Sequence, residues 1–264
     1  MSGRIGEAAQ TLLAVYDKGE PCGPLTERYE DLTLDEAYQV QLEQVRQWNE
    51  SGRVLRGHKV GLTSRAMQQQ LGVDQPDYGH LFADMFHAGD VPVDVGRYIA
   101  PRIEPEIAFV LGRPLKGPGV TVPDAVRAVE FVLPALEIID SRIRDWRITL
   151  VDTIADNASS GGIVLGAQPS PLSAADLATV GCNLFRNGRL ADTGTGGAVL
   201  GHPLRALVWL ANTLGGFGVT LREGDVVLPG SCTTALPVTP GDVFQALFDG
   251  LGSVSVEFSA KESP

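Results

Sequence analysis

The sequence predicts an α+β protein in which an N-terminal helical lobe precedes a mixed β core. Apolar residues recur at helical spacing over residues 3–18 and 33–51. Near Val54 the character of the chain changes, and Gly, Pro and short β-branched runs then dominate. Strands outnumber helices in this second part, in an irregular order that argues against regular βαβ units. We therefore expect a helical lobe over residues 1–53 and a mixed β catalytic domain over residues 54–264, the two being able to pack as one unit.

The lobe is predicted to contain two helices. In the first, over residues 3–18, Ile5, Leu12 and Tyr16 fall on one face. A turn with Gly and Pro follows at residues 19–24. Thr33 followed by Glu36 is the pattern of a capping box, in which each side chain accepts from the other residue's backbone N–H. This pair predicts the start of a helix over residues 33–51.

The second part begins with a predicted short strand over residues 57–63. A helix over residues 64–71 and a polar loop over residues 72–79 are expected next. Further strands are predicted over residues 102–111, 162–165, 183–186, 225–228, 243–248 and 253–258, and further helices over residues 122–132 and 203–215.

Composition excludes several classes of function. Lys and Arg number 21 against 32 Asp and Glu, which gives a formal net charge of −11. Without a long basic run, binding to nucleic acid or to an anionic membrane is not expected. The three cysteines are widely spaced and predict neither a disulfide framework nor a zinc finger. No secretory signal or membrane span is apparent, so a reducing cytoplasm is the expected compartment.

The segment from Arg102 to Val110 carries the strongest chemical signal. Alternate residues of a strand share a face, so Glu104 and Glu106 are expected to point the same way beside an apolar run. Two such carboxylates repel each other unless a cation lies between them, and oxygen ligands suit Mg²⁺, Mn²⁺ or Ca²⁺. A solvated strand face is the alternative from this segment alone.

Glu137 lies in the apolar run from Phe131 to Ile139, where a buried carboxylate requires a partner. That partner is either Arg142 or a metal ion shared with Glu104 and Glu106. In the second case three carboxylates hold the ion on one side and leave the other side open for water and substrate.

Two further segments are candidates for the site. Lys59 stands between His58 and Val60 in a glycine-containing strand, where it could pair with a carboxylate, bind substrate or transfer protons. A Lys that extends from the strand end to solvent is the alternative. Residues 152–162 combine small hydroxyl side chains with glycines that permit a close approach to a ligand, although such strings also form plain turns.

Together these segments resemble the 2-keto-4-pentenoate hydratase family, within the wider fumarylacetoacetate-hydrolase-like superfamily. The resemblance covers most of the chain and rests on Lys59–Ser64, Gly72–Gly79, Glu104–Glu106, Pro134–Arg142, Asp145–Arg147, Asp152–Ser160 and Gly250–Ser253. It implies a mixed β-roll fold with an added helical lobe. It also implies homo-oligomers, in some cases with a companion pathway enzyme.

The resemblance also implies roles for residues. It implies that Glu104, Glu106 and Glu137 are ligands of Mg²⁺ or Mn²⁺ and that Lys59 and Asp77 are catalytic residues. It also implies that Ser160 binds the substrate, and Arg142 is added as a second candidate for substrate binding. The implied reaction is the hydration of 2-hydroxypenta-2,4-dienoate to 4-hydroxy-2-oxopentanoate in aromatic or steroid catabolism.

Three alternatives stay open at this point. A decarboxylase that resembles 4-oxalocrotonate decarboxylase would share the metal ligands and Lys59, and would need a further cation such as Arg65 or Arg142 for its second carboxylate. A C–C hydrolase of the superfamily is less well matched, because no Glu-x-x-His helix is present. A partner subunit without activity would not need the cluster of like charges.

Overall fold

The computed structural model describes residues 3–64, 68–69 and 73–259. Among these residues the strands form two sheets. The larger sheet runs in the order β2–β1–β10–β5–β6–β7–β3, and β11 pairs with β5 at its side. Its strands are β1 (Leu55–Gly61), β2 (Asp77–Phe82), β3 (Phe86–His87), β5 (Arg102–Leu111), β6 (Val129–Ile139), β7 (Ser160–Leu165), β10 (Val226–Leu228) and β11 (Leu236–Pro237).

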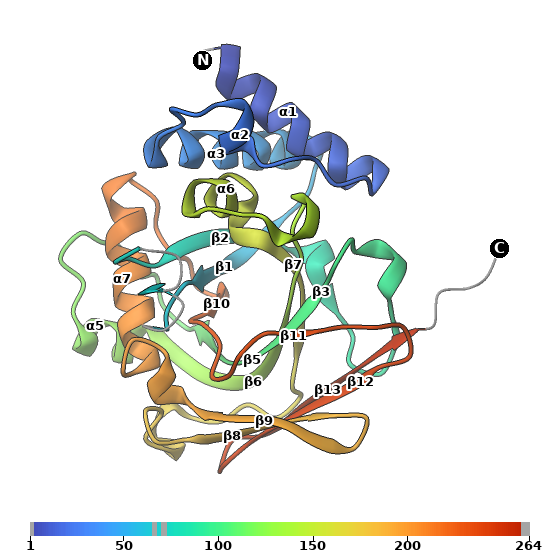
Figure 1. The fold of residues 1–264 in the computed structure, drawn as a ribbon. Coiled ribbons are helices and arrows are strands. Elements are labelled where there is room, and N and C mark those ends of the chain that lie inside the picture. Colours follow the sequence, from blue (N-terminus) through green and yellow to red (C-terminus); the bar gives the residue numbers. More distant parts are fainter. Residues whose placement is uncertain (1–2, 65–67, 70–72, 260–264) are drawn as a thin grey trace.

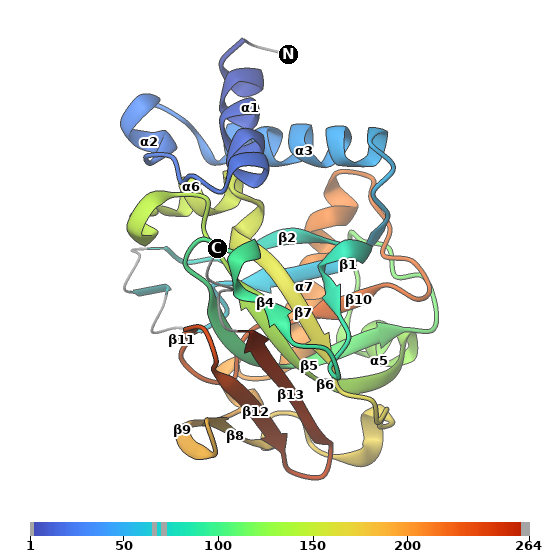
Figure 2. The same cartoon turned by 90° about the vertical axis from the view of Figure 1, so that its right-hand side faces the viewer.

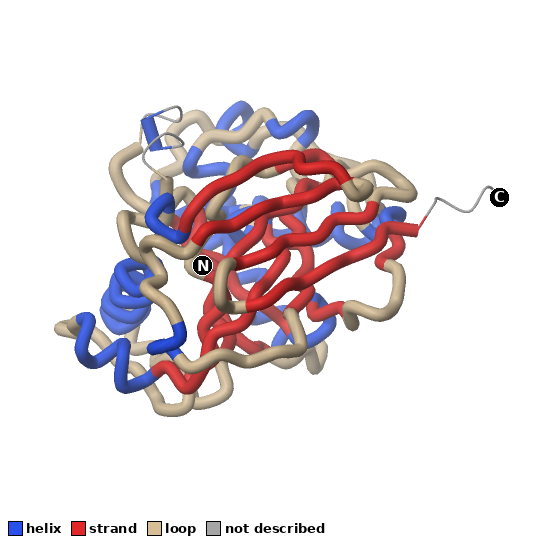
Figure 3. The backbone as a smooth tube through the Cα atoms, turned by 90° about the horizontal axis from the view of Figure 1, so that it is seen from below, coloured by secondary structure: helices blue, strands red, loops and turns tan. Residues whose placement is uncertain are grey.

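This larger sheet is strongly curled. Figure 1 shows it passing from β2 near the lobe, through β1 and β10, down to β5 and β6, and back up through β7. The smaller sheet lies below it in the order β4–β13–β12–β8–β9, and Figure 3 shows its strands from that side. Its strands are β4 (Val93–Asp94), β8 (Gly181–Arg186), β9 (Arg189–Thr195), β12 (Val243–Phe248) and β13 (Gly252–Ser259). The predicted mixed β core is therefore confirmed.

The helices cover the outside of the curled sheet. The lobe of α1 (Gly3–Lys18), α2 (Leu25–Arg28) and α3 (Leu34–Glu50) lies on the side of β2 and α6 (Leu150–Ala155), as Figure 2 shows. The helices α5 (Val122–Ala128) and α7 (Pro203–Gly216) contact each other beside the sheet, on the left in Figure 1. Short 3-10 turns complete the described elements, at Ala83–Met85, Val95–Arg97, Arg144–Trp146, Asn157–Ser159, Leu172–Ala174 and Gly196–Ala198.

The predicted helices of the lobe are confirmed, including the capping box. Thr33 Oγ1 accepts from Glu36 N–H at 3.3 Å, and Glu36 Oε2 accepts from Thr33 N–H at 3.1 Å. The apolar core of the lobe also includes Ile143 and Ile154 from the second part of the chain. The two parts thus share a core, while the domain boundary at residue 54 stays a prediction.

Other predicted boundaries need correction. The helix predicted over residues 122–132 ends at Ala128, because the chain then enters β6, where Val132 and Leu133 are buried and pair with β5. The loop predicted over residues 72–79 gives way at Asp77 to β2, which pairs with β1. Most of the helix predicted over residues 64–71 lies outside the described residues. No helix in the described part of the chain has the length and apolarity that crossing a membrane requires.

Candidate active site

The strands β5 and β6 bring three glutamates together. In their antiparallel register Glu104 faces Glu137 directly, and Glu106 lies two residues farther along the same face of β5. Each of these residues offers a carboxylate oxygen that lies within 4.8 Å of the other two. Glu106 and Glu137 are buried, and Glu104 is partly exposed. We call this set the acidic cluster.

The acidic cluster is electrostatically unfavourable without a cation. Burial first, and then the neighbouring carboxylate of Glu137, raise the pKa of Glu104 to about 7. The same two causes raise the pKa of Glu106 well above its ordinary value. Glu106 Oε1 and both carboxylate oxygens of Glu137 are buried without a hydrogen-bond partner among the described residues. Because unpaired buried oxygens are costly, the donor set fits a hard divalent cation of the kind that Mg²⁺ or Mn²⁺ represents.

Lys59 supplies the buried positive charge beside the acidic cluster. It lies on β1, its Nζ is 3.4 Å from Glu137 Oε1, and it donates to the carbonyl of Ala158 at 3.1 Å. Burial opposes its charged form, but the carboxylates of Glu137 and Asp77 outweigh burial and raise the pKa of Lys59. The residue is therefore held as an ammonium cation, and the alternative of a Lys that extends to solvent is wrong.

Asp77 begins β2 directly opposite Gly61 on β1. Its side chain is buried, and burial is the main cause that raises its pKa. A Cβ atom at residue 61 would lie 2.2 Å from Asp77 Oδ1, so glycine is required there for the carboxyl group to fit. Asp77 Oδ1 has no hydrogen-bond partner among the described residues, which leaves it available for a proton or a ligand.

A strained turn forms the wall beside Lys59. Asn157, Ala158 and Ser159 all have positive φ angles, of 52°, 50° and 53°, which are unfavourable for residues other than glycine. The Asn157 side chain fixes this turn to β2, because its Oδ1 accepts from His80 N–H at 2.8 Å and its Nδ2 donates to the His80 carbonyl at 2.9 Å. The turn presents the Ala158 carbonyl to Lys59.

A pocket of about 730 Å³ opens onto these residues. Lys59, Asp77 and Glu104 line it, so the structure brings together predicted site residues from β1, β2 and β5. The segment from Gly230 to Ala235 also lines the pocket, and Gly230 N–H donates to Glu106 Oε2 at 2.7 Å. Apolar and small residues complete much of the wall, among them Leu62, Ile139, Trp146, Ile148 and Ala198.

Arg142 and Ser160 lie behind the pocket wall. The Arg142 guanidinium donates to Asp156 Oδ1 at 2.6 Å and to the carbonyls of Ser160 and Asp156, both at 3.0 Å. Ser160 Oγ donates to the carbonyl of Asn157 at 2.7 Å. Because these groups are already engaged and buried, the geometry does not support the predicted contacts of Arg142 and Ser160 with substrate. Arg142 also does not pair with Glu137, whose cationic partner is Lys59.

Sequence reasoning did not assign roles to four residues that line the pocket. Ser159, one residue before the predicted Ser160, lines it together with Thr153, and their hydroxyls share a hydrogen bond of 3.2 Å. Arg102 and Trp146 line its outer part. The run of small residues at 152–162 indicated the segment that contains Ser159 and Thr153. Which serine of this segment lines the pocket depends on the strained turn. Arg65, proposed for a second carboxylate, lies outside the described residues.

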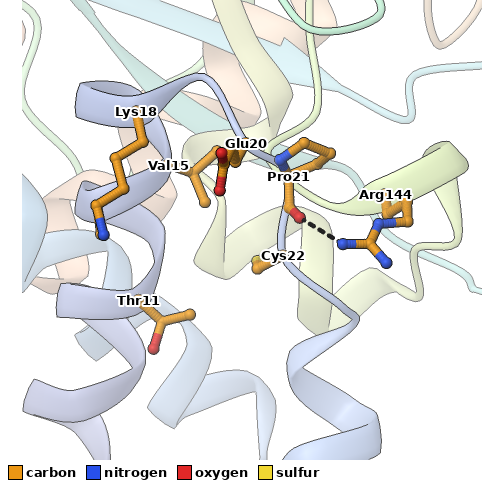
Figure 4. A pocket seen from close by; sticks show the side chains of 8 residues that line it. Thr11, Val15, Lys18, Glu20, Pro21, Cys22 and Arg144 are labelled. Atoms are coloured by element: carbon orange, nitrogen blue, oxygen red, sulfur yellow. Dashed lines mark hydrogen bonds between the residues drawn. The ribbon is translucent and has the colours of Figure 1, made fainter.

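A second pocket, of about 460 Å³, lies at the lobe and is lined by α1 residues and the segment that follows them. Figure 4 shows Lys18 and Arg144 at this pocket, with Arg144 donating to the Pro21 carbonyl at 3.1 Å. None of the predicted site residues lines it. The acidic cluster and the larger pocket are therefore the candidate active site.

The sequence pattern described as the fumarylacetoacetate (FAA) hydrolase C-terminal region matches residues 56–259. The chain belongs to this family. Within the FAA hydrolase family, it is 44% identical over 256 residues to 2-keto-4-pentenoate hydratase of Paraburkholderia xenovorans, a match that covers 97% of this chain and 95% of that protein. It is 41% identical over 258 residues to 2-oxo-hept-4-ene-1,7-dioate hydratase of Escherichia coli, covering 95% and 96% of the two chains.

A solved structure is also closely similar to this chain. The 4-oxalocrotonate decarboxylase from Pseudomonas putida G7, complexed with magnesium and adipate, superposes with a TM-score of 0.94 at 36% identity, covering 98% of each chain. The predicted superfamily and its mixed β fold are thereby confirmed.

Proposed function

We propose that this chain catalyses the hydration of 2-hydroxypenta-2,4-dienoate to 4-hydroxy-2-oxopentanoate in the catabolism of aromatic compounds by meta-cleavage. The observation that carries the proposal is the acidic cluster beside Lys59 and Asp77 at one pocket. This arrangement occurs in a chain that matches a 2-keto-4-pentenoate hydratase over nearly its whole length. The enzyme is thus a hydro-lyase, which adds water to a carbon–carbon double bond.

We further propose Glu104, Glu106 and Glu137 as ligands of Mg²⁺ or Mn²⁺. The buried carboxylate oxygens without hydrogen-bond partners support this assignment, as does the magnesium in the structure of the related decarboxylase. A bound divalent ion would act as a Lewis acid that draws electron density from the 2-oxygen of the substrate. Lys59, paired with Glu137, would hold that carboxylate in place and balance part of the charge of the acidic cluster.

Asp77 is the proposed group for proton transfer. The reaction needs a proton at C5 when the dienol becomes a 2-oxo-3-enoate, and another at C3 after water oxygen bonds to C4. Burial raises the pKa of Asp77, so its carboxyl group holds a proton more readily than an exposed aspartate does. With its Oδ1 unpaired and its side chain at the pocket, Asp77 would deliver and recover these protons.

Ser159 and Thr153 replace Ser160 and Arg142 in the proposed substrate contacts. Both residues line the pocket, and because one hydroxyl donates to the other, only the second keeps its hydrogen for a carboxylate oxygen. The apolar residues Leu62 and Ile139 would exclude water from the diene, so that the added water reaches C4 in a fixed orientation.

Decarboxylation is the second candidate reaction. It is favoured by the fold similarity to 4-oxalocrotonate decarboxylase, which is nevertheless lower in identity than the hydratases, at 36% against 44%. The two activities are separated by the product, because decarboxylation releases CO₂ and hydration does not.

The test uses protein stripped of metal and then given Mg²⁺ or Mn²⁺. Fresh 2-hydroxypenta-2,4-dienoate is added, the loss of dienol absorbance is followed, and the product is identified by NMR. Formation of 4-hydroxy-2-oxopentanoate that depends on the ion is the expected result. No turnover of this compound, together with CO₂ release from 2-oxohex-3-enedioate, would replace hydration by decarboxylation. No turnover of any dienoate would favour the remaining alternative, a partner subunit without catalytic activity.

A further inference from the structure

Arg102 lies on the strand that carries two residues of the acidic cluster. The register of β5 against β6 is unbroken from residue 102 to residue 110, so Arg102, Glu104 and Glu106 point to the same face. Along this face exposure rises from the buried Glu106 to the partly exposed Glu104 and Arg102. Arg102 therefore stands on the solvent side of the acidic cluster, at the outer part of the pocket that it lines.

The guanidinium of Arg102 is stacked on the ring of Trp146, and its positive charge also acts on Glu104. Its Cζ lies 4.4 Å from the ring centroid of Trp146, and the Trp146 Nε1 donates to the Ala100 carbonyl at 2.9 Å, which holds the ring in place. Among the described residues no carboxylate or carbonyl accepts a hydrogen bond from Arg102. Stacking leaves the edge of the guanidinium, with its five N–H donors, open to a planar anion.

We propose that Arg102 is a specificity-determining residue that binds a carboxylate at the far end of the substrate chain. This inference rests on the proposed function and extends it to 2-hydroxy-2,4-dienoates that end in a second carboxylate. The carboxylate and 2-oxygen of the substrate lie at the acidic cluster in this arrangement, and the chain runs outward along β5. A guanidinium receives a carboxylate in two parallel hydrogen bonds, a geometry that a single ammonium cannot offer.

The spacing of residues along β5 leaves room for an extended chain between the acidic cluster and Arg102. Strands rise about 3.4 Å per residue, so the backbone positions of Arg102 and Glu104 are about 7 Å apart. Three bonds of an extended chain span about 3.6 Å, and the five bonds from C2 to C7 therefore span about 6 Å. The pocket volume of about 730 Å³ is in the range of pockets that hold drug-sized ligands, well beyond what a five-carbon acid needs.

The experiment compares Arg102→Gln with the wild type on two substrates, 2-hydroxyhepta-2,4-diene-1,7-dioate and 2-hydroxypenta-2,4-dienoate. The measured quantity is the ratio of kcat/KM for the diacid to that for the monoacid. Loss of a charge-assisted hydrogen-bonded pair should lower this ratio about 10- to 100-fold, mainly through KM of the diacid. Arg102→Lys should recover part of it. Arg113→Gln, which removes an exposed arginine outside the pocket, is the matched control and should leave the ratio unchanged.

Calorimetric binding of heptanedioate and heptanoate to the Mg²⁺-loaded proteins gives the same comparison without turnover. An unchanged ratio in Arg102→Gln, including equal losses on both substrates, would overturn the inference and assign Arg102 to the shared carboxylate or to the fold. Wild-type turnover of the monoacid without preference for heptanedioate would also overturn it, while the proposed hydratase function would stand. Absence of all turnover alongside selective heptanedioate binding would instead overturn the proposed function and leave the binding role of Arg102 supported.

Discussion

Replacing Glu106 by Gln should reverse the order of stability between wild type and variant when Mg²⁺ is added. Glu106 is 0% exposed, its Oε2 accepts from Gly230 N–H at 2.7 Å, and its Oε1 has no hydrogen-bond partner among the described residues. Gln keeps the size of the side chain and an oxygen that accepts from Gly230. It replaces a carboxyl group whose ionisation burial, Glu137 and Glu104 oppose, and its amide can donate to both neighbours. Without metal, the variant should therefore be at least as stable as the wild type.

With Mg²⁺ present at roughly 100 times its dissociation constant, the wild type should gain about 2.7 kcal/mol. For a chain of this length such a gain raises Tm by roughly 5–10 °C. The variant has lost a ligand and should gain little. Thermal unfolding in EDTA and in Mg²⁺ measures both effects, with Glu130→Gln, an exposed glutamate on β6, as the control. An equal Mg²⁺-induced rise in Glu106→Gln would refute the ligand assignment, and turnover at the wild-type rate would do so independently.

Three further outcomes are expected. Lys59→Met removes the ammonium 3.4 Å from Glu137 Oε1, and steady-state assays should show kcat lower by at least about 100-fold with an unchanged circular dichroism spectrum; near-normal kcat would contradict the proposed role. Asn157→Ala removes both hydrogen bonds to the His80 backbone, and urea unfolding should show a loss of about 2–3 kcal/mol; a loss below about 0.5 kcal/mol would mean that other contacts hold the turn. Burial lowers the pKa of His80 from 6.5 to about 4. Between these pH values His80 therefore binds a proton in the unfolded chain but not in the folded chain. The contribution of His80 to the free energy of unfolding is thus complete above pH 6.5 and falls by about 3 kcal/mol toward pH 4. Urea midpoints of the wild type and of His80→Gln across this pH range test the sign of this change. Midpoints that shift in parallel in the two proteins would argue against it.

The acidic cluster could be predicted from the sequence because its cause is local. Glu104 and Glu106 are two residues apart in a strand, and Glu137 lies in a run too apolar to leave a carboxylate unpaired. The antiparallel pairing of β5 with β6 then places Glu137 opposite Glu104. The helical spacing of apolar residues is also enough to predict the helices of the lobe, and the capping box at Thr33 marks the start of α3.

The proposed substrate contacts depend on longer-range geometry. Whether Ser159 or Ser160 faces the pocket is decided by three successive positive φ angles, which are imposed by the contact of Asn157 with β2, a strand 77 residues away in sequence. The sequence predicts Arg142 as a partner of Glu137 or of the substrate, yet its guanidinium pairs with Asp156, 14 residues later. Arg102 gains its significance from the contact with Trp146, which no local pattern specifies.

Hydrogen bonds from the helical lobe to the β core limit how the two parts can evolve separately. Gln41 Nε2 donates to the carbonyls of Tyr78 at 3.0 Å and Ile154 at 2.7 Å, and Gln44 Nε2 donates to that of Ala155 at 2.7 Å. These buried carbonyls belong to β2 and α6, which lead directly to Asp77 and to the strained turn. Gene fusion or domain exchange that kept residues 56–259 and replaced the lobe would remove the glutamine donors from three carbonyls behind the pocket wall. Lobe and core are therefore expected to evolve as one piece, with glutamine at both positions in any recombinant that remains active.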